Sequence, residues 1–144
     1  MSEVKADDQG FTLLEILLVL ILLAGSGFYL LIKLPVNVEK QHLAFESTKL
    51  LEDIRDTRQA ALAENISYVV KFYYMGDPHY QIFRQGKLIN NTYLQDGIEF
   101  LGTPQDLTFN ALGRSAGTTI TLKNSLGEQK SVIIAPVGMR IREK

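Results

Sequence analysis

The hydrophobic and polar positions divide the chain into three stretches with different periodicities. Residues 11–32 are apolar on every face of a helix, and Glu15 is their one acidic or basic side chain. A helix of about 22 residues is about 33 Å long, close to the hydrocarbon thickness of a bilayer. Because a domain of this size does not need a helix that is apolar all round, residues 11–33 are predicted to form a membrane-spanning helix.

The second stretch, residues 34–65, is amphipathic and is predicted to continue the first helix. Positions spaced three or four residues apart form one weakly polar face that is expected to pack on a domain. These positions are Leu43, Ser47, Leu50, Ile54, Thr57 and Ala61.

Three acidic residues, Glu52, Asp53 and Asp56, gather on the remaining surface of this helix. They allow two interpretations, a metal site or a solvated face with ion pairs to Arg55 and Arg58. The second is preferred, because basic residues are interleaved with the acids at helical spacing.

The third stretch, residues 66–144, has the short alternating runs that are typical of strands. Strands are expected at residues 68–75, 79–84, 87–89, 97–101, 107–109, 118–122, 131–135 and 139–141. The connections contain turn residues and are too short for crossover helices, so the sheet should be antiparallel. The fold class predicted is α+β, with one long N-terminal helix packed on an antiparallel sheet.

The first helix contains residues that weaken a helix. Gly25 and Gly27 lie within the apolar run, and Pro35 follows it. Glycine destabilises a helix interior, and proline removes a backbone donor. The segment is therefore either a site of bending or, since small residues allow close approach, a site of helix packing.

The junction between the polar N-terminus and the apolar run carries a short motif, residues 10–15 with the sequence Gly-Phe-Thr-Leu-Leu-Glu. It resembles the N-terminus of type IV pilins and pseudopilins. The resemblance implies that a prepilin peptidase removes leader residues 1–10 by cutting after Gly10, that Phe11 is then N-methylated, and that Glu15 serves subunit assembly. The alternative is an ordinary signal anchor with an incidental acid near a helix N-terminus, where negative charge is favourable.

The later part of the chain extends this resemblance. Residues 110–117 resemble the loop before the final hairpin of H-type minor pseudopilins, and residues 137–141 are similar to the last strand of that group. The nearest group by resemblance is the ComGD type of Gram-positive competence operons. This implies a pilin-like fold and a part in DNA uptake.

Composition excludes several kinds of site. The net charge of −1 does not suit a generally basic nucleic-acid binder, and the absence of cysteine excludes disulfides and thiolate ligands. The two histidines, His42 and His79, have no partner at ligand spacing. We therefore expect no enzyme, no cofactor and no metal site.

Charge is distributed unevenly, since residues 113–144 hold six basic residues against two acidic ones. Three interpretations are open, in order of preference: strand edges protected from aggregation, contacts to another subunit, and contacts to DNA phosphates. The candidate contact residues are Arg114, Lys123, Lys130, Arg140 and Arg142.

These observations together predict a minor pseudopilin of a competence pseudopilus. It would cross the membrane once with its C-terminal domain outside, and would join a cell-surface filament. Its partners would be other pilin-like subunits, the prepilin peptidase, membrane lipid and, through the filament, extracellular DNA. The alternatives are a pseudopilin of a type II secretion system, a subunit of a type IV pilus, and a signal-anchored DNA-binding domain that never polymerises.

Overall fold

The computed structural model describes residues 12–136 and 141–143 of the chain, and for residues 26–37 it describes the backbone alone. The chain divides into two compact units, Met1–Val36 and Asn37–Lys144. The predicted leader, residues 1–10, lies outside the described residues.

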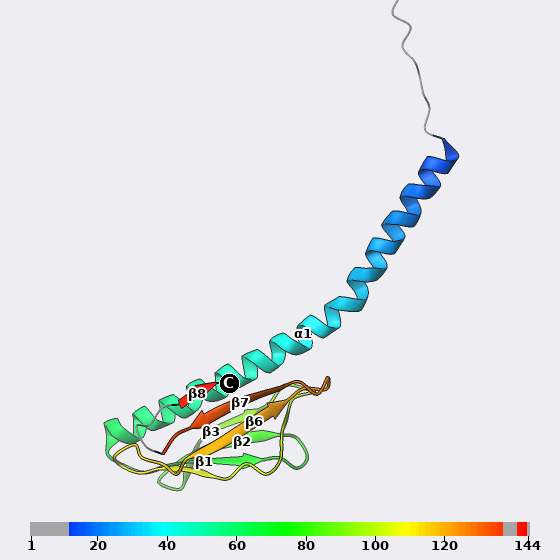
Figure 1. Cartoon of the computed structure of the whole chain (residues 1–144). Helices are drawn as coiled ribbons and strands as arrows, with labels where there is room; N and C mark the ends of the chain where they lie inside the picture. Colours follow the sequence, from blue (N-terminus) through cyan, green and yellow to red (C-terminus); the bar gives the residue numbers. More distant parts are fainter. Residues whose placement is uncertain (1–11, 137–140, 144) are drawn as a thin grey trace, which may run out of the picture. The chain divides into compact units, whose positions relative to one another are not determined.

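One helix and eight strands make up the described secondary structure (Figure 1). The helix α1 covers Leu13–Glu64 and therefore belongs to both units. The strands are β1 (Tyr68–Tyr73), β2 (His79–Arg84), β3 (Lys87–Tyr93), β4 (Glu99–Phe100), β5 (Leu107–Phe109), β6 (Thr118–Lys123), β7 (Gln129–Ile134) and β8 (Ile141–Glu143).

The second unit has the predicted α+β architecture, and all of its described strand pairs are antiparallel. The expectation of a single sheet was wrong. The strands form two four-stranded sheets, ordered β3-β2-β1-β5 and β4-β6-β7-β8. The division arises because β4 pairs with β6, whereas β5 returns to pair with β1.

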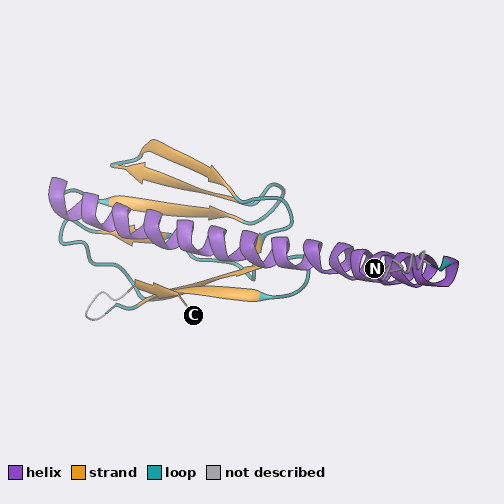
Figure 2. Cartoon of the chain, turned by 90° about the horizontal axis from the view of Figure 1, so that it is seen from above, coloured by secondary structure: helices purple, strands orange, loops and turns teal. Residues whose placement is uncertain are grey.

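The C-terminal part of α1 runs along both sheets (Figure 2). The six positions of the predicted face are all buried and, with the inward side chains of both sheets, form one core. An edge-on contact between Phe72 of β1 and Phe100 of β4, with ring centroids 5.6 Å apart, joins the two sheets within this core.

The two hydroxyl residues of the buried face have hydrogen-bond partners. Thr57 Oγ1 donates to the carbonyl of Asp53 at 2.6 Å, and Ser47 Oγ donates to Glu143 Oε1 at 2.7 Å. A buried hydroxyl without a partner would destabilise the fold, so these bonds explain why polar residues are tolerated at core positions.

Helix α1 ends in a left-handed cap. Asn65 has a φ of 55°, and the amide of Ile66 donates to the carbonyl of Ala61. This is the Schellman arrangement, in which asparagine can replace the usual glycine. The chain turns there and enters β1.

We predict that Ile54→Ala lowers the free energy of unfolding by about 2–5 kcal/mol, because Ile54 is fully buried between α1 and the sheets. Denaturant unfolding of the full chain in detergent measures this. The control, Val38→Ala, changes an exposed residue of the same helix and should shift stability by no more than about 0.5 kcal/mol. Equal effects of the two changes would contradict the proposed core.

Candidate assembly surface

The first turn of α1 is capped by Thr12. Its carbonyl accepts the amides of Glu15 and Ile16, and Thr12 Oγ1 accepts the amide of Glu15 at 3.3 Å. Thr12 is thus the N-cap residue and Glu15 the third helical residue, which is the spacing of a capping box. The motif that suggested a pilin N-terminus also places a carboxylate where the helix dipole favours it.

The helix that follows presents apolar side chains on all sides. Every leucine, isoleucine and valine from Leu13 to Leu23 is exposed within the unit, by between 45% and 82%. A helix of this kind needs lipid or other apolar helices around it, because burial of apolar area is its main source of stabilisation.

The predicted membrane span stays a prediction. In the part of the chain that the structure describes, no helix meets the length and hydrophobicity needed to cross a bilayer. The predicted span, however, includes Phe11 and the side chains of residues 26–33, which lie outside the described residues.

The other predicted features of this unit are also untested. Gly10 and Phe11, the expected cleavage and methylation positions, lie outside the described residues. Gly25, Gly27 and Pro35 all lie in α1, whose helical backbone continues through them. A role for them in bending stays a prediction.

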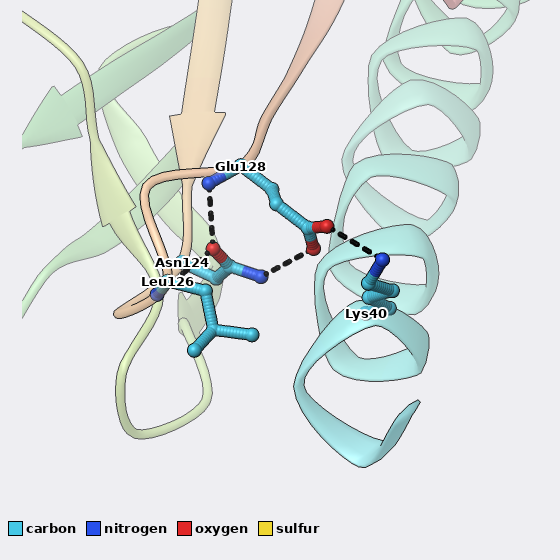
Figure 3. A network of polar contacts seen from close by, with 4 residues as sticks. All are labelled: Lys40, Asn124, Leu126 and Glu128. Carbon is cyan, nitrogen blue, oxygen red and sulfur yellow. Dashed lines mark hydrogen bonds and ion pairs between the residues drawn. The ribbon is translucent and has the colours of Figure 1, made fainter. Parts of the chain in front are cut away.

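In the second unit, a polar contact fixes the hairpin between β6 and β7 to α1 (Figure 3). Lys40 Nζ lies 2.9 Å from Glu128 Oε1, and Asn124 Nδ2 donates to Glu128 Oε2. Asn124 Oδ1 in turn accepts the amides of Leu126 and Glu128, so the turn itself holds the carboxylate in position. The hydrogen bond from Lys40, followed by that from Asn124, lowers the pKa of Glu128.

A second contact fixes the C-terminal strand β8 to the same helix. Glu143 accepts hydrogen bonds from Ser47 of α1 and from Lys130 of β7, and Arg55 Nη2 donates to the carbonyl of Ile141 at 2.8 Å. Burial acts to raise the pKa of Glu143, but the bonds from Lys130 and Ser47 outweigh it, so the pKa is lowered. The last described strand is therefore held by ionic contacts as well as by pairing.

The acidic cluster of α1 is partly solvated, as expected, since Glu52 and Asp56 are exposed, but Asp53 bonds to a strand residue. Asp53 accepts a short hydrogen bond from the buried hydroxyl of Tyr80. Arg55 and Arg58 donate to the carbonyls of Ile141 and Gly113. These contacts form because the sheets approach this side of the helix. Among the described residues, no group of three acidic, histidine or cysteine residues is arranged to hold a metal ion.

Glu46 of α1 lies outside the predicted buried face, yet it is only 1% exposed. It lies three residues after Leu43 and four before Leu50, so helical spacing places it beside the buried face, and only its charge argued for the surface. Its Oε2 has no hydrogen-bond partner among the described residues. Burial raises the pKa of Glu46, against weaker opposing effects of Lys49, the amide of Gln95 and His42.

The predicted basic residues lie on separate elements. Lys123 at the end of β6 pairs with Glu99 at 3.1 Å, and Lys130 of β7 pairs with Glu143. Arg142 is exposed on the edge strand β8, and Arg114 is exposed in the loop after β5. Arg140 lies outside the described residues. Contact of this set with DNA or with a subunit stays a prediction.

No model of a known protein family and no curated protein matches the sequence. The structure is similar to that of the minor pseudopilin EpsH from the Type 2 Secretion System of Vibrio cholerae, with a TM-score of 0.60 and 14% sequence identity. The match covers 72% of this chain and 96% of EpsH. At this identity the similarity establishes a fold of the minor pseudopilin kind.

We predict that Glu46→Gln flattens the dependence of stability on pH. Because the pKa of Glu46 is raised in the folded protein, the folded state keeps a proton that the unfolded state loses above about pH 4.5. The stabilisation from this proton is complete below that pH and is lost as the pH rises through the raised pKa. Glutamine keeps the shape of the protonated acid and removes this loss.

Unfolding of the full chain in detergent, measured from pH 4 upward, tests this prediction. The control Glu52→Gln changes an exposed glutamate of the same helix and should leave the slope unchanged. A Glu46→Gln profile parallel to that of the original chain would refute the assignment.

Proposed function

We propose that this protein is a minor pseudopilin, cut after Gly10, stored in the membrane by residues 11–33 and then built into a surface filament. After cleavage and methylation, Phe11 would begin the mature chain, and the second unit would lie outside the membrane. The partners would be other pilin-like subunits, the prepilin peptidase and membrane lipid.

One observation carries the proposal. An apolar helix, exposed on all sides and interrupted by a single acid at Glu15, continues into a unit that has the fold of a minor pseudopilin. Such a helix is stable in two surroundings, a bilayer and a bundle of like helices. Movement from the first to the second is what assembly of a membrane-stored filament subunit requires.

Glu15 supplies a means of setting the stagger between subunits. It follows Phe11 by four residues, or about 6 Å along a helix. The new N-terminal amine of one subunit could then meet the Glu15 carboxylate of its neighbour in an apolar surrounding. A charge pair there is favourable when both members are in place, and an unpaired charge is costly. An arrangement with the correct stagger would therefore be lower in free energy than one with an incorrect stagger.

The second part of the proposal concerns whether the pseudopilin belongs to a competence system or to a secretion system. The resemblance of the chain to the ComGD type favours a competence pseudopilus and a part in DNA uptake. The similarity in fold to EpsH, a type II secretion subunit, keeps a secretion pseudopilus as the alternative. Direct binding of DNA has less support, because two of the basic residues, Lys123 and Lys130, are already paired with acids.

We predict cleavage between Gly10 and Phe11 in the native host. Mass spectrometry of the protein from host membranes should find an N-terminal methylated phenylalanine. Gly10→Leu should leave the leader attached, because a bulky residue blocks access to the peptidase site. The control Gln9→Leu, one residue earlier, should be processed. An intact N-terminus in the original chain would remove the pseudopilin proposal.

We predict that Glu15→Leu inserts into the membrane and is cleaved, yet loses at least about tenfold in incorporation into filaments, as expected for loss of a buried charge pair. Glu15→Gln serves as a matched variant, since glutamine also completes a capping box but carries no charge. If the charge of Glu15 matters, both variants should lose incorporation into filaments. If only the capping box matters, Glu15→Leu alone should lose it.

Cross-linking to partner subunits in the native membrane, together with transformation frequency, measures the outcome. Incorporation of both variants at the original level would show that Glu15 does not direct assembly. Normal transformation with impaired secretion in a strain without the protein would favour the secretion alternative.

A further inference from the structure

Three aromatic rings form a row across the outer face of the first sheet. Tyr73 of β1, His79 of β2 and Tyr93 of β3 occupy matching positions in the strand register. Tyr73 and His79 stack with their centroids 4.5 Å apart and their planes at 5°, and the centroid of Tyr93 lies 4.8 Å from that of His79. His79 Nδ1 donates to the carbonyl of Asp77, which fixes the central ring.

The end of this row is exposed. Tyr93 is 56% exposed, and Tyr74 and Met75, which follow Tyr73 at the other end of the row, are also open to solvent. Tyrosine side chains that are held rigidly at the surface are favoured at binding sites, since they offer contact area at little cost in conformational entropy.

A cavity of about 340 Å³ opens beside the row, between residues 76–78 and residues 93–99. Tyr93 belongs to both the ring row and the wall of the cavity. Asp77, Asp96 and Glu99 also line it, and none of its described lining residues is basic. Gln95, a further lining residue, has a buried Oε1 without a hydrogen-bond partner among the described residues.

The charge of this cavity is not balanced from within the described chain. Glu99 is paired with Lys123 at 3.1 Å, but neither Asp77 nor Asp96 takes part in a described ion pair. The cavity therefore offers the carboxylates of Asp77 and Asp96 as acceptors, beside Tyr93.

We infer that this acidic corner, formed by Asp77, Tyr93 and Asp96, binds an arginine side chain presented by a neighbouring subunit of the filament. The guanidinium group is planar and carries five N–H donors, so it can stack on Tyr93 while it donates to carboxylates. The assignment of the partner as a subunit rests on the proposed function, whereas the chemistry of the corner does not.

Other occupants fit less well. The described residues contain no group of three acids arranged for a metal ion, and the excess of carboxylates over cations at this cavity disfavours an anionic ligand such as DNA. A sugar could stack on tyrosine and donate hydroxyl protons to the acids, but it would leave the negative charge uncompensated. Charge complementarity therefore selects a basic side chain.

A peptide titration of the purified full chain in detergent micelles tests this chemistry. The probe is acetyl-Gly-Arg-Gly amide, and its neutral isostere, with citrulline in place of arginine, is the matched ligand. In ¹⁵N NMR spectra the arginine peptide should shift the amides of Gly76, Tyr93 and Asp96. The citrulline peptide should bind at least about tenfold more weakly, as expected for loss of charge-assisted hydrogen bonds.

Substitutions in the corner separate the contribution of its carboxylates to peptide binding from that of the tyrosine ring. Asp77→Asn combined with Asp96→Asn should weaken binding of the arginine peptide by about tenfold. Tyr93→Ala should weaken it by about twofold to fivefold, and Tyr93→Phe, which keeps the ring, should not. The control Asp56→Asn removes an exposed acid of α1 away from the cavity and should leave binding unchanged.

Several outcomes would overturn the inference. These are no shifts at the named amides, equal shifts with the citrulline peptide, or tighter binding of cellotetraose at the same amides, which would assign the corner to a glycan. In the native membrane, the Asp77→Asn and Asp96→Asn variant should be cleaved normally but cross-link less to partner subunits.

Normal cross-linking of that variant, with peptide binding confirmed in vitro, would remove the neighbouring subunit as the partner. An uncleaved original chain would instead refute the proposed function and leave the chemistry of the corner standing. The two failures are therefore distinguishable.

Discussion

Burial of one face of α1 against two sheets is the interaction on which the second unit depends. The residues of that face lie at three- and four-residue intervals, so a single straight helix brings them all to the core. Each sheet contributes one inward face. The contact between Phe72 and Phe100 joins the two sheets beneath the helix. Without the helix, both inward faces would be exposed to water.

Polar contacts around the buried face of α1 determine how the sheets are attached to this helix. Lys40 with Glu128 secures the turn between β6 and β7, and Ser47 with Glu143 secures β8. At the far end of the helix, Arg84 of β2 lies 2.6 Å from Glu64, and the hydrogen bond from Arg84 lowers the pKa of that glutamate. Exposed ion pairs add little stability each, so their main effect is to define register and orientation.

The same helix meets two physical requirements along its length. In its second part, the apolar face is buried against the sheets of the same chain. In its first part, every apolar side chain from Leu13 to Leu23 is exposed. The proposed function would require this division, because the folded unit would have to remain intact while the surroundings of the first part change from lipid to protein. The acidic corner beside Tyr93 would add a polar contact between folded units to the apolar contact between helices.

Local periodicity in the sequence predicted the helix face and the approximate positions of the strands, because each depends on residues close together in the chain. The motif at Gly10, Phe11 and Glu15 was likewise readable from sequence. The tertiary structure decided the rest. The assignment of β4 to the second sheet and β5 to the first depends on pairing between residues distant in the chain. The alternation of polar and apolar residues within a strand does not predict such pairing. The burial of Glu46, the pairing of Lys123 and Lys130, and the meeting of Asp77, Tyr93 and Asp96 at one cavity all arise from contacts between separate elements.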